Sequence, residues 1–242
     1  MTPSAPSHWA TVAGHWDAIG PPLRPSPEDV ETIVALVAER PPTRRRVLVL
    51  GATRELGAVA WPEATALVAI DRSPSMLHTL WSGPPGTSAL GEWRALPLAS
   101  ASIDVAVCDG GWHLLDRPAG QEQLAAELAR VVAPGGRLAV RLFEPSPEAP
   151  TLDEVLDLLE ASEVVDANHL KVLLWMAVRD ADRRVAVARA WDALVAAHPD
   201  LDELADRHGW PRATVRAFEP YRGSPDRYDL IDGDELDRQL AA

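Results

Sequence analysis

Two residues of this sequence, a glycine and an aspartate twenty positions further on, have types and spacing that suit ligand chemistry. Gly51 follows the apolar run 47–50, and Asp71 follows a second apolar run at 66–70. A glycine at such a place lets the backbone turn sharply and lets a ligand approach it closely. A carboxylate offers two acceptor oxygens, which suit the vicinal hydroxyl groups of a ribose. The pair therefore predicts a nucleotide-type site at the ends of two strands.

The elements that would position this pair follow from hydrophobic patterning. A continuous apolar run at 47–50 predicts a strand at 46–50 that is buried on both faces, and a second apolar run lies at 66–70. Further strands are predicted at 103–108 and 137–142. Helical patterns lie between these runs, one of them at 58–67. Strands that alternate with helices predict a doubly wound, mostly parallel α/β sheet. After Ser146 the pattern turns helical, which predicts a helical lid insertion at 146–210, before a short strand at 228–231 and a last helix at 233–240.

Composition limits the class of protein. The chain has 242 residues, and we expect a single domain made of four stretches: an N-terminal cover at 1–27, a core at 28–145, the lid at 146–210 and a closing strand and helix at 211–242. The net charge of −13 argues against nucleic acid as a partner. No apolar run reaches the roughly 18 residues that span a membrane, and the start lacks a secretion signal, so a cytoplasmic location is expected. Cys108 is the only cysteine, which excludes an internal disulfide.

Four segments of the chain together resemble the class I S-adenosylmethionine-dependent methyltransferases. They are Val47-Leu48-Val49-Leu50-Gly51, Val68-Ala69-Ile70-Asp71, Leu96-Pro97-Leu98 followed by 102–107, and Arg130-Val131-Val132-Ala133-Pro134-Gly135-Gly136-Arg137-Leu138. They cover about residues 44–143 in the order and spacing of that family. The resemblance implies a seven-stranded Rossmann-like sheet and S-adenosylmethionine as the cofactor. The N-terminal segment and the helical insertion lie where such enzymes form the substrate pocket.

The resemblance also implies roles for single residues. Those expected at the cofactor are Gly51, Asp71 with its neighbour Arg72, Glu92, Trp93, Asp109 and Gly110. Asp71 would bind the ribose hydroxyls, and Trp93 could stack on the adenine. The first motif of the family usually has an acidic residue two before this glycine and two further glycines after it. Val49, Thr53 and Glu55 occupy those places here. We expect Thr53 to offer a hydroxyl and Glu55 to meet the cofactor's amino group.

Methyl transfer from a sulfonium needs little protein chemistry beyond alignment in a dry pocket, and a base only where the nucleophile holds its proton tightly. The candidates for that catalytic role are His113, Tyr221 and Tyr228. Trp16, Trp112 and Trp175 could form an aromatic wall for the substrate, although core packing explains them equally well. The acidic composition favours a small-molecule substrate, and a homodimer is compatible with the sequence.

Other functions fit parts of the pattern. A non-catalytic partner subunit would explain the altered glycine motif, and a cyclase that consumes the cofactor would use its other electrophilic carbons. Gly51 to Gly57 also resembles the glycine turn of short-chain dehydrogenases, but those enzymes need a tyrosine four residues before a lysine. Lys171 is the only lysine, and Ala167 precedes it by four. Asp109, His113 and Asp116 suggest a metal site less strongly than a capping carboxylate and a pocket-lining histidine, so no metal is expected.

Overall fold

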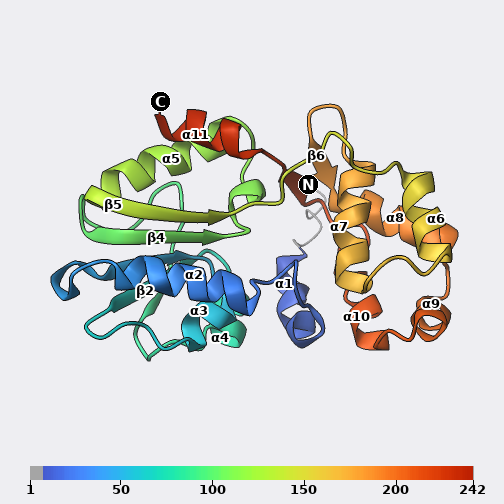
Figure 1. Ribbon diagram of the computed structural model, residues 1–242, viewed down its shortest axis with the longest axis horizontal. Helices are drawn as coiled ribbons and strands as arrows, with labels where there is room; N and C mark the ends of the chain where they lie inside the picture. The colour runs from blue at the N-terminus through green and yellow to red at the C-terminus, as the bar shows by residue number, and fades with distance from the viewer. Residues whose placement is uncertain (1–7, 242) are drawn as a thin grey trace, which may run out of the picture. The chain divides into compact units, whose positions relative to one another are not determined.

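The computed structural model describes residues 8–241, and Figure 1 labels its helices and strands. The residues group into two compact units, each built from two stretches of sequence. Of the described residues, the sheet unit comprises 24–143 and 231–241, and the helical unit comprises 8–23 and 144–230.

The sheet unit is organised around five parallel strands. They are β1 Arg46–Leu50, β2 Ala66–Asp71, β3 Ser88–Leu90, β4 Ile103–Asp109 and β5 Val132–Arg141. The strand order is β3-β2-β1-β4-β5, and every neighbouring pair is parallel. Because β2 and β3 lie on one side of β1 and β4 and β5 on the other, the strand order reverses at β1. Ligands of open α/β sheets bind outside the carboxyl ends of the strands at such a switch point.

The predicted fold class, a doubly wound parallel α/β sheet, is confirmed, but the predicted seven strands are not. Within the described residues the central sheet has five strands. Two further strands, β6 Arg184–Ala186 and β7 Arg227–Asp229, pair antiparallel in the helical unit. β7 overlaps the short strand predicted at 228–231. Its partner β6 has three residues, which is too short for a periodic signal in the sequence.

Both faces of the sheet are buried, because successive side chains of a strand point to opposite sides. On one face, Val47 and Val49 of β1 pack in a cluster with Val37 of α2. On the other face, Leu48 and Leu50 pack in a cluster with side chains of α5 and α11. Burial of each such side chain contributes about 1.5–3 kcal/mol. The two-sided burial is the reason that these strands are continuous apolar runs in the sequence.

Five α-helices and two short 3₁₀ helices flank the sheet in the described residues. They are α2 Pro27–Ala38, η2 Pro42–Arg44, α3 Arg54–Ala58, α4 Pro74–Leu80, η3 Trp112–Leu114, α5 Ala119–Val131 and α11 Gly233–Ala241. Ser26 and Asp29 form a capping box that begins α2. α11 lies beside α5 (Figure 1). The helix predicted at 58–67 is wrong: α3 ends at Ala58, and the prolyl residue Pro62 disfavours a helix beyond it.

A buried carboxylate ties β4 to β1 at the amino ends of the two strands. Asp104 is fully buried, and its Oδ2 accepts hydrogen bonds from the backbone N–H and the Nε of Arg46, at 3.1 Å and 2.7 Å. Arg44 donates to Oδ1 of the same side chain. These bonds with Arg46 lower the pKa of Asp104 to about 2, against the opposing effect of burial. The ion pairs thus compensate a charge inside the sheet.

The helical unit contains the remaining elements. They are α1 Trp9–Val12, η1 Ala13–Ala18, α6 Leu152–Glu160, α7 Ala167–Val178, β6, α8 Val187–Ala197, α9 Leu201–His208, α10 Arg212–Arg216, η4 Glu219–Tyr221 and β7. Thr151, Asp166 and Asp200 cap the first turns of α6, α7 and α9. The stretches predicted at 1–27 and 211–242 are each divided between the two units, at Leu23 and Leu230. No helix within residues 8–241 is long and apolar enough to cross a bilayer.

Candidate functional site

The carboxyl end of β1 continues into a tight turn at Gly51. This glycine has φ +97°, in the region that residues with a side chain rarely adopt. Its N–H donates to the carbonyl oxygen of Ile70 at 2.9 Å. The strand register pairs Leu50 with Ile70 on one side and with Cys108 on the other. The ends of β2, β1 and β4 therefore lie side by side at this turn.

Asp71 closes β2 beside the glycine turn, as the spacing of the two residues predicted. Its carboxylate is 8% exposed and accepts two backbone hydrogen bonds, from Ala52 at 3.1 Å and from Ser73 at 2.7 Å. Burial raises the pKa of Asp71 against these two bonds, which lower it. Each oxygen accepts one of these bonds, and a carboxylate has about four lone-pair sites. The side chain thus keeps acceptor capacity at the carboxyl end of β2.

Trp93 lies across the same strand ends. Its indole Nε1 donates to the carbonyl oxygen of Ile70 at 2.7 Å. A Cβ atom built on Gly51 would lie 3.4 Å from Cζ2 of the indole, and one built on Gly111 would lie 2.9 Å from Cη2. The half-buried ring therefore covers the backbone of both glycines, and packs on the cluster around Leu50.

Two residues that replace glycines of the family motif begin α3. Thr53 is buried at the N-cap position, where its side chain makes no capping hydrogen bond. Oε1 of Glu55 accepts a hydrogen bond of 2.6 Å from Nε of Arg24. Oε2 of the same carboxylate is buried without a hydrogen-bond partner among the described residues. Glu55 therefore holds one acceptor that the fold does not satisfy.

Glu92 and Arg72, two other residues expected at the cofactor, differ in what they contact. The carboxylate of Glu92 accepts hydrogen bonds from the guanidinium of Arg94, at 3.2 Å and 3.3 Å. Partial burial opposes ionisation of Glu92, but the bonds with Arg94 outweigh it and lower its pKa. Arg72 is exposed. Glu92 is thus engaged with its own neighbour in the chain.

The end of β4 brings three predicted residues together. Asp109 pairs with Arg141 of β5 through a short hydrogen bond, and burial raises its pKa against this interaction. Gly110 follows with φ +60°, and His113 is buried two residues beyond Gly111. The imidazole of His113 lies edge-on to Phe143, with ring centroids 5.3 Å apart. His113 is therefore the predicted catalytic residue that lies in the same unit as the glycine turn.

Two polar side chains at these strand ends fit the groups of S-adenosylmethionine. Asp71 has acceptor capacity for ribose hydroxyls, and the unsatisfied Oε2 of Glu55 suits an ammonium group. The indole of Trp93, in contrast, lies against the glycine backbone that a ligand would approach. The acceptors fit the cofactor, and the position of one aromatic ring does not.

Trp112, predicted for a substrate wall, is a core residue of the sheet unit. It is fully buried, and its Nε1 donates to Oε1 of Gln239 in α11 at 2.9 Å. Nε2 of Gln239 in turn donates to Oε1 of Gln121 in α5. This chain of bonds docks α11 on the sheet unit and leaves no exposed face of the indole. Cys108 is likewise fully buried, and burial raises its thiol pKa to about 12, as suits a core residue.

The other aromatic residues that the sequence selected lie in the helical unit. Tyr221 and Tyr228 are buried with their hydroxyl oxygens 3.4 Å apart. Trp175 contacts Tyr228 edge-on, with ring centroids 4.9 Å apart, and Trp16 is half-buried in η1. Burial raises the pKa of both tyrosines, so at neutral pH their hydroxyls are protonated. Both hydroxyls are therefore neutral hydrogen-bonding groups.

Around these tyrosines lie three polar residues that the sequence did not single out for function. Nε2 of His8 is 2.9 Å from the hydroxyl of Tyr228, and Nδ1 of His8 is 2.6 Å from Oδ2 of Asp226. Nζ of Lys171 donates to the carbonyl oxygen of Ala217 at 2.8 Å. Burial lowers the pKa of Lys171 to about 7. Its uniqueness in the sequence was the one signal that could have drawn attention to it.

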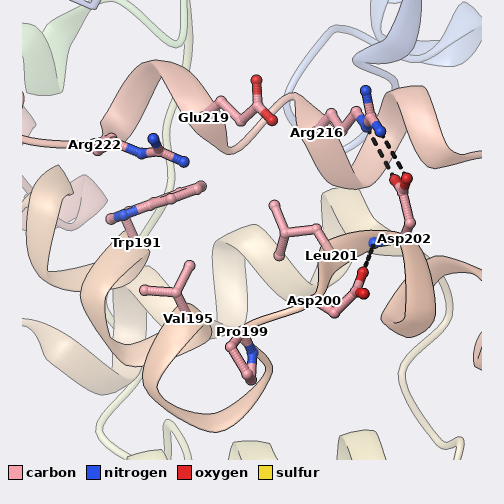
Figure 2. Close-up of a pocket in the computed structure, with 9 residues that line it drawn as sticks. All are labelled: Trp191, Val195, Pro199, Asp200, Leu201, Asp202, Arg216, Glu219 and Arg222. Carbon is pink, nitrogen blue, oxygen red and sulfur yellow. Dashed lines mark hydrogen bonds and ion pairs between the residues drawn. The ribbon is translucent and has the colours of Figure 1, made fainter.

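A surface cavity of about 710 Å³ also lies in the helical unit (Figure 2). Figure 2 shows the guanidinium of Arg222 over the ring of Trp191, 4.7 Å from its centroid. It also shows Arg216 paired with Asp202, at 2.6 Å. None of the residues predicted for cofactor or substrate lines this cavity. Among residues 8–241 no group of three or more histidine, cysteine or acidic side chains is placed to hold a metal.

Comparison with known proteins relates part of the chain to one family. The model of a family described as "Methyltransferase domain" matches residues 49–140, which is less than half of the chain. This segment begins near the end of β1 and holds the glycine turn, β2, β3, β4 and most of β5. The match supports the resemblance of this segment to the class I methyltransferases. It also supports an S-adenosylmethionine-dependent enzyme activity for this segment.

Solved structures are similar to this chain at low identity. A protein from Rhodobacter sphaeroides described as a Zn-dependent alcohol dehydrogenase is 19% identical with a TM-score of 0.59, over 96% of this chain and 86% of that one. The CcbJ methyltransferase from Streptomyces caelestis is 22% identical with a TM-score of 0.46, over 57% of this chain and 58% of that one. At 19% identity, the similarity to the protein from Rhodobacter sphaeroides shows the fold alone. None of the curated proteins matches the sequence.

Proposed function

We propose that this protein transfers a methyl group from S-adenosylmethionine to a small-molecule nucleophile. The observation that carries the proposal is the match of residues 49–140 to a methyltransferase domain, in which Gly51 and Asp71 meet at the switch point of the sheet. The cofactor supplies an electrophilic methyl group, so the protein needs mainly to bind, align and exclude water. Asp71 would accept hydrogen bonds from the ribose hydroxyls. Oε2 of Glu55 would accept one from the amino group.

A small molecule is proposed as the substrate because the chain carries a net charge of −13, which opposes binding to a polyanion. For the same reason we do not propose nucleic acid as a partner. We also propose a cytoplasmic location. His113 is the proposed base for a nucleophile that must lose a proton, since it is buried near the end of β4. The predicted roles of Tyr221, Tyr228, Trp16 and Trp175 toward a substrate stay predictions.

The test is a calorimetric titration with S-adenosylhomocysteine of the wild type and of Asp71→Asn. The amide keeps one acceptor oxygen but loses the charge and one acceptor, so we expect at least tenfold weaker binding, about 1.4 kcal/mol. Glu127→Gln is the matched control, because Glu127 pairs with Arg130 in the same unit and its side chain is 19% exposed. Equal affinities of the wild type and Asp71→Asn would remove the assignment of Asp71.

One observation favours a second candidate function, a partner subunit that binds no cofactor. The indole of Trp93 lies over both glycines of the crevice. A folded wild type that binds no S-adenosylhomocysteine would support this candidate over methyl transfer. A cyclase is distinguished by its product, because it would release methylthioadenosine in place of S-adenosylhomocysteine.

A further inference from the structure

The switch point of the sheet presents three backbone surfaces to a ligand. They are the carbonyl of Ile70 at the end of β2, the turn at Gly51 after β1, and Gly111 after β4. Because glycine has no side chain, each of the last two lets another group reach the backbone closely. In open α/β sheets a ligand takes this place.

In this protein the indole of Trp93 lies against all three of these backbone surfaces. Its Nε1 is bonded to the carbonyl of Ile70 at 2.7 Å, Cζ2 is the indole atom nearest to Gly51, and Cη2 is the one nearest to Gly111. A Cβ on Gly111 would lie 2.9 Å from the ring, which is inside van der Waals contact. A ligand that rests on the glycines therefore needs the volume that the six-membered ring fills.

The ring can leave this place without unfolding the sheet. Trp93 is half-buried and belongs to the segment after β3, where an isolated bridge joins Glu92 to Ala95 and the ends of the strands are not involved. If the indole left, the hydrogen bond from its Nε1 to the carbonyl oxygen of Ile70 would break. That oxygen would still accept a hydrogen bond from the N–H of Gly51. The cost is thus confined to one side chain and its contacts.

We propose that Trp93 is a gate of the cofactor crevice: its indole occupies the place of the cofactor and leaves when the cofactor binds. The inference rests on the proposed function, since it concerns the same site. Part of the binding free energy of the cofactor is used to displace the ring, which lowers the affinity of the wild type. Removal of the ring therefore tightens binding. This differs from the sequence-based expectation, in which Trp93 stacks on the adenine and its removal weakens binding.

The test measures by calorimetry how tightly three proteins bind S-adenosylhomocysteine: the wild type, Trp93→Ala and Trp93→Phe. We expect Trp93→Ala to bind at least tenfold more tightly than the wild type. We expect Trp93→Phe to lie between them, because phenylalanine keeps a ring but loses the bond to Ile70. Trp61→Ala is the matched control: Trp61 is also half-buried and donates to a backbone carbonyl, that of Leu56, on the opposite face of the sheet. Its affinity should equal that of the wild type.

A second measurement tests the gate in the wild type and does not depend on the affinity of a variant. The indole N–H signal that Trp93→Phe removes from the ¹⁵N spectrum identifies Trp93 among the nine tryptophans. In the wild type this signal should shift when S-adenosylhomocysteine is added, since the bond to Ile70 breaks. An unmoved signal in a ligand-bound wild type would overturn the gate even if Trp93→Ala failed to fold.

The outcomes separate the gate from the proposed function. If the wild type binds and Trp93→Ala binds equally or more weakly, the gate is wrong and methyl transfer stands. If the folded wild type and both folded variants fail to bind, the gate and the proposed function are both wrong. If only the variants bind, the indole closes the crevice without leaving it, which overturns the gate and favours the partner subunit that binds no cofactor.

Discussion

The hydroxyl of Tyr228 lies 2.9 Å from Nε2 of His8, although the two residues are 220 positions apart. Nδ1 of His8 lies 2.6 Å from Asp226, whose carboxylate can only accept, so Nδ1 carries the proton. Nε2 is then the acceptor of the Tyr228 hydroxyl. Burial lowers the pKa of His8 against the opposing effect of Asp226. This pair therefore joins the start of the described chain to β7 inside the helical unit.

Replacement of this histidine should destabilise the helical unit. In His8→Ala the hydroxyl of Tyr228 loses the acceptor Nε2, and Asp226 loses one of its donors. We expect the free energy of unfolding to fall by about 2 kcal/mol, the usual cost of leaving buried polar groups unsatisfied. Urea denaturation followed by circular dichroism measures it. His78→Ala is the control, because His78 is exposed on α4. A midpoint equal to that of the wild type would contradict the role of the pair.

Lys171 should make stability depend on pH. Its pKa is about 7 in the folded chain because burial disfavours the ammonium, whereas an unfolded lysine titrates near about 10.4. Between these two values the unfolded state binds more protons, so this group makes stability rise with pH. Below about pH 7 both states are protonated, and the full burial penalty applies.

The comparison with Lys171→Met isolates this effect from other titrating groups. Methionine fills a similar volume without charge, so the variant should gain more stability over the wild type at pH 6 than at pH 9. We expect the two gains to differ on the order of 2 kcal/mol, from the slope of 1.36 kcal/mol per unit of pH. Urea midpoints at both pH values give the result. A gain that is the same at both pH values would show that Lys171 is not desolvated.

Glu55 should distinguish ligands that have an amino group from those that do not. Its Oε2 is buried without a hydrogen-bond partner in the described part of the chain, beside the turn that begins α3. We expect Glu55→Gln to weaken the binding of S-adenosylhomocysteine about tenfold, since the charge-assisted acceptor is lost. Methylthioadenosine lacks the amino acid part, so its affinity should not change. Equal losses for both ligands in calorimetry would assign Glu55 to the structure of the turn.

The class of fold could be predicted from the sequence because its signals are local. Val47 to Leu50 are apolar without alternation, which marks a strand with helices on both faces, and both clusters of the sheet unit confirm it. The meeting of Gly51 and Asp71 was also accessible, because parallel strands in register bring their carboxyl ends to one edge. These inferences need only periodicity and the geometry of a parallel sheet.

The directions of the side chains at the site depend on contacts between residues far apart in the sequence, which no local pattern shows. Trp93 could have stacked on a ligand, but it points at the glycines because Ile70, 23 positions earlier, offers a carbonyl oxygen. Trp112 resembled a substrate wall and is a core residue, since Gln239 from the far end of the chain bonds to it. Side-chain direction is decided by such distant partners, so only the tertiary structure could set it. The sequence by itself determined the sheet and its edge, and the fold decided which side chains are free to meet a ligand there.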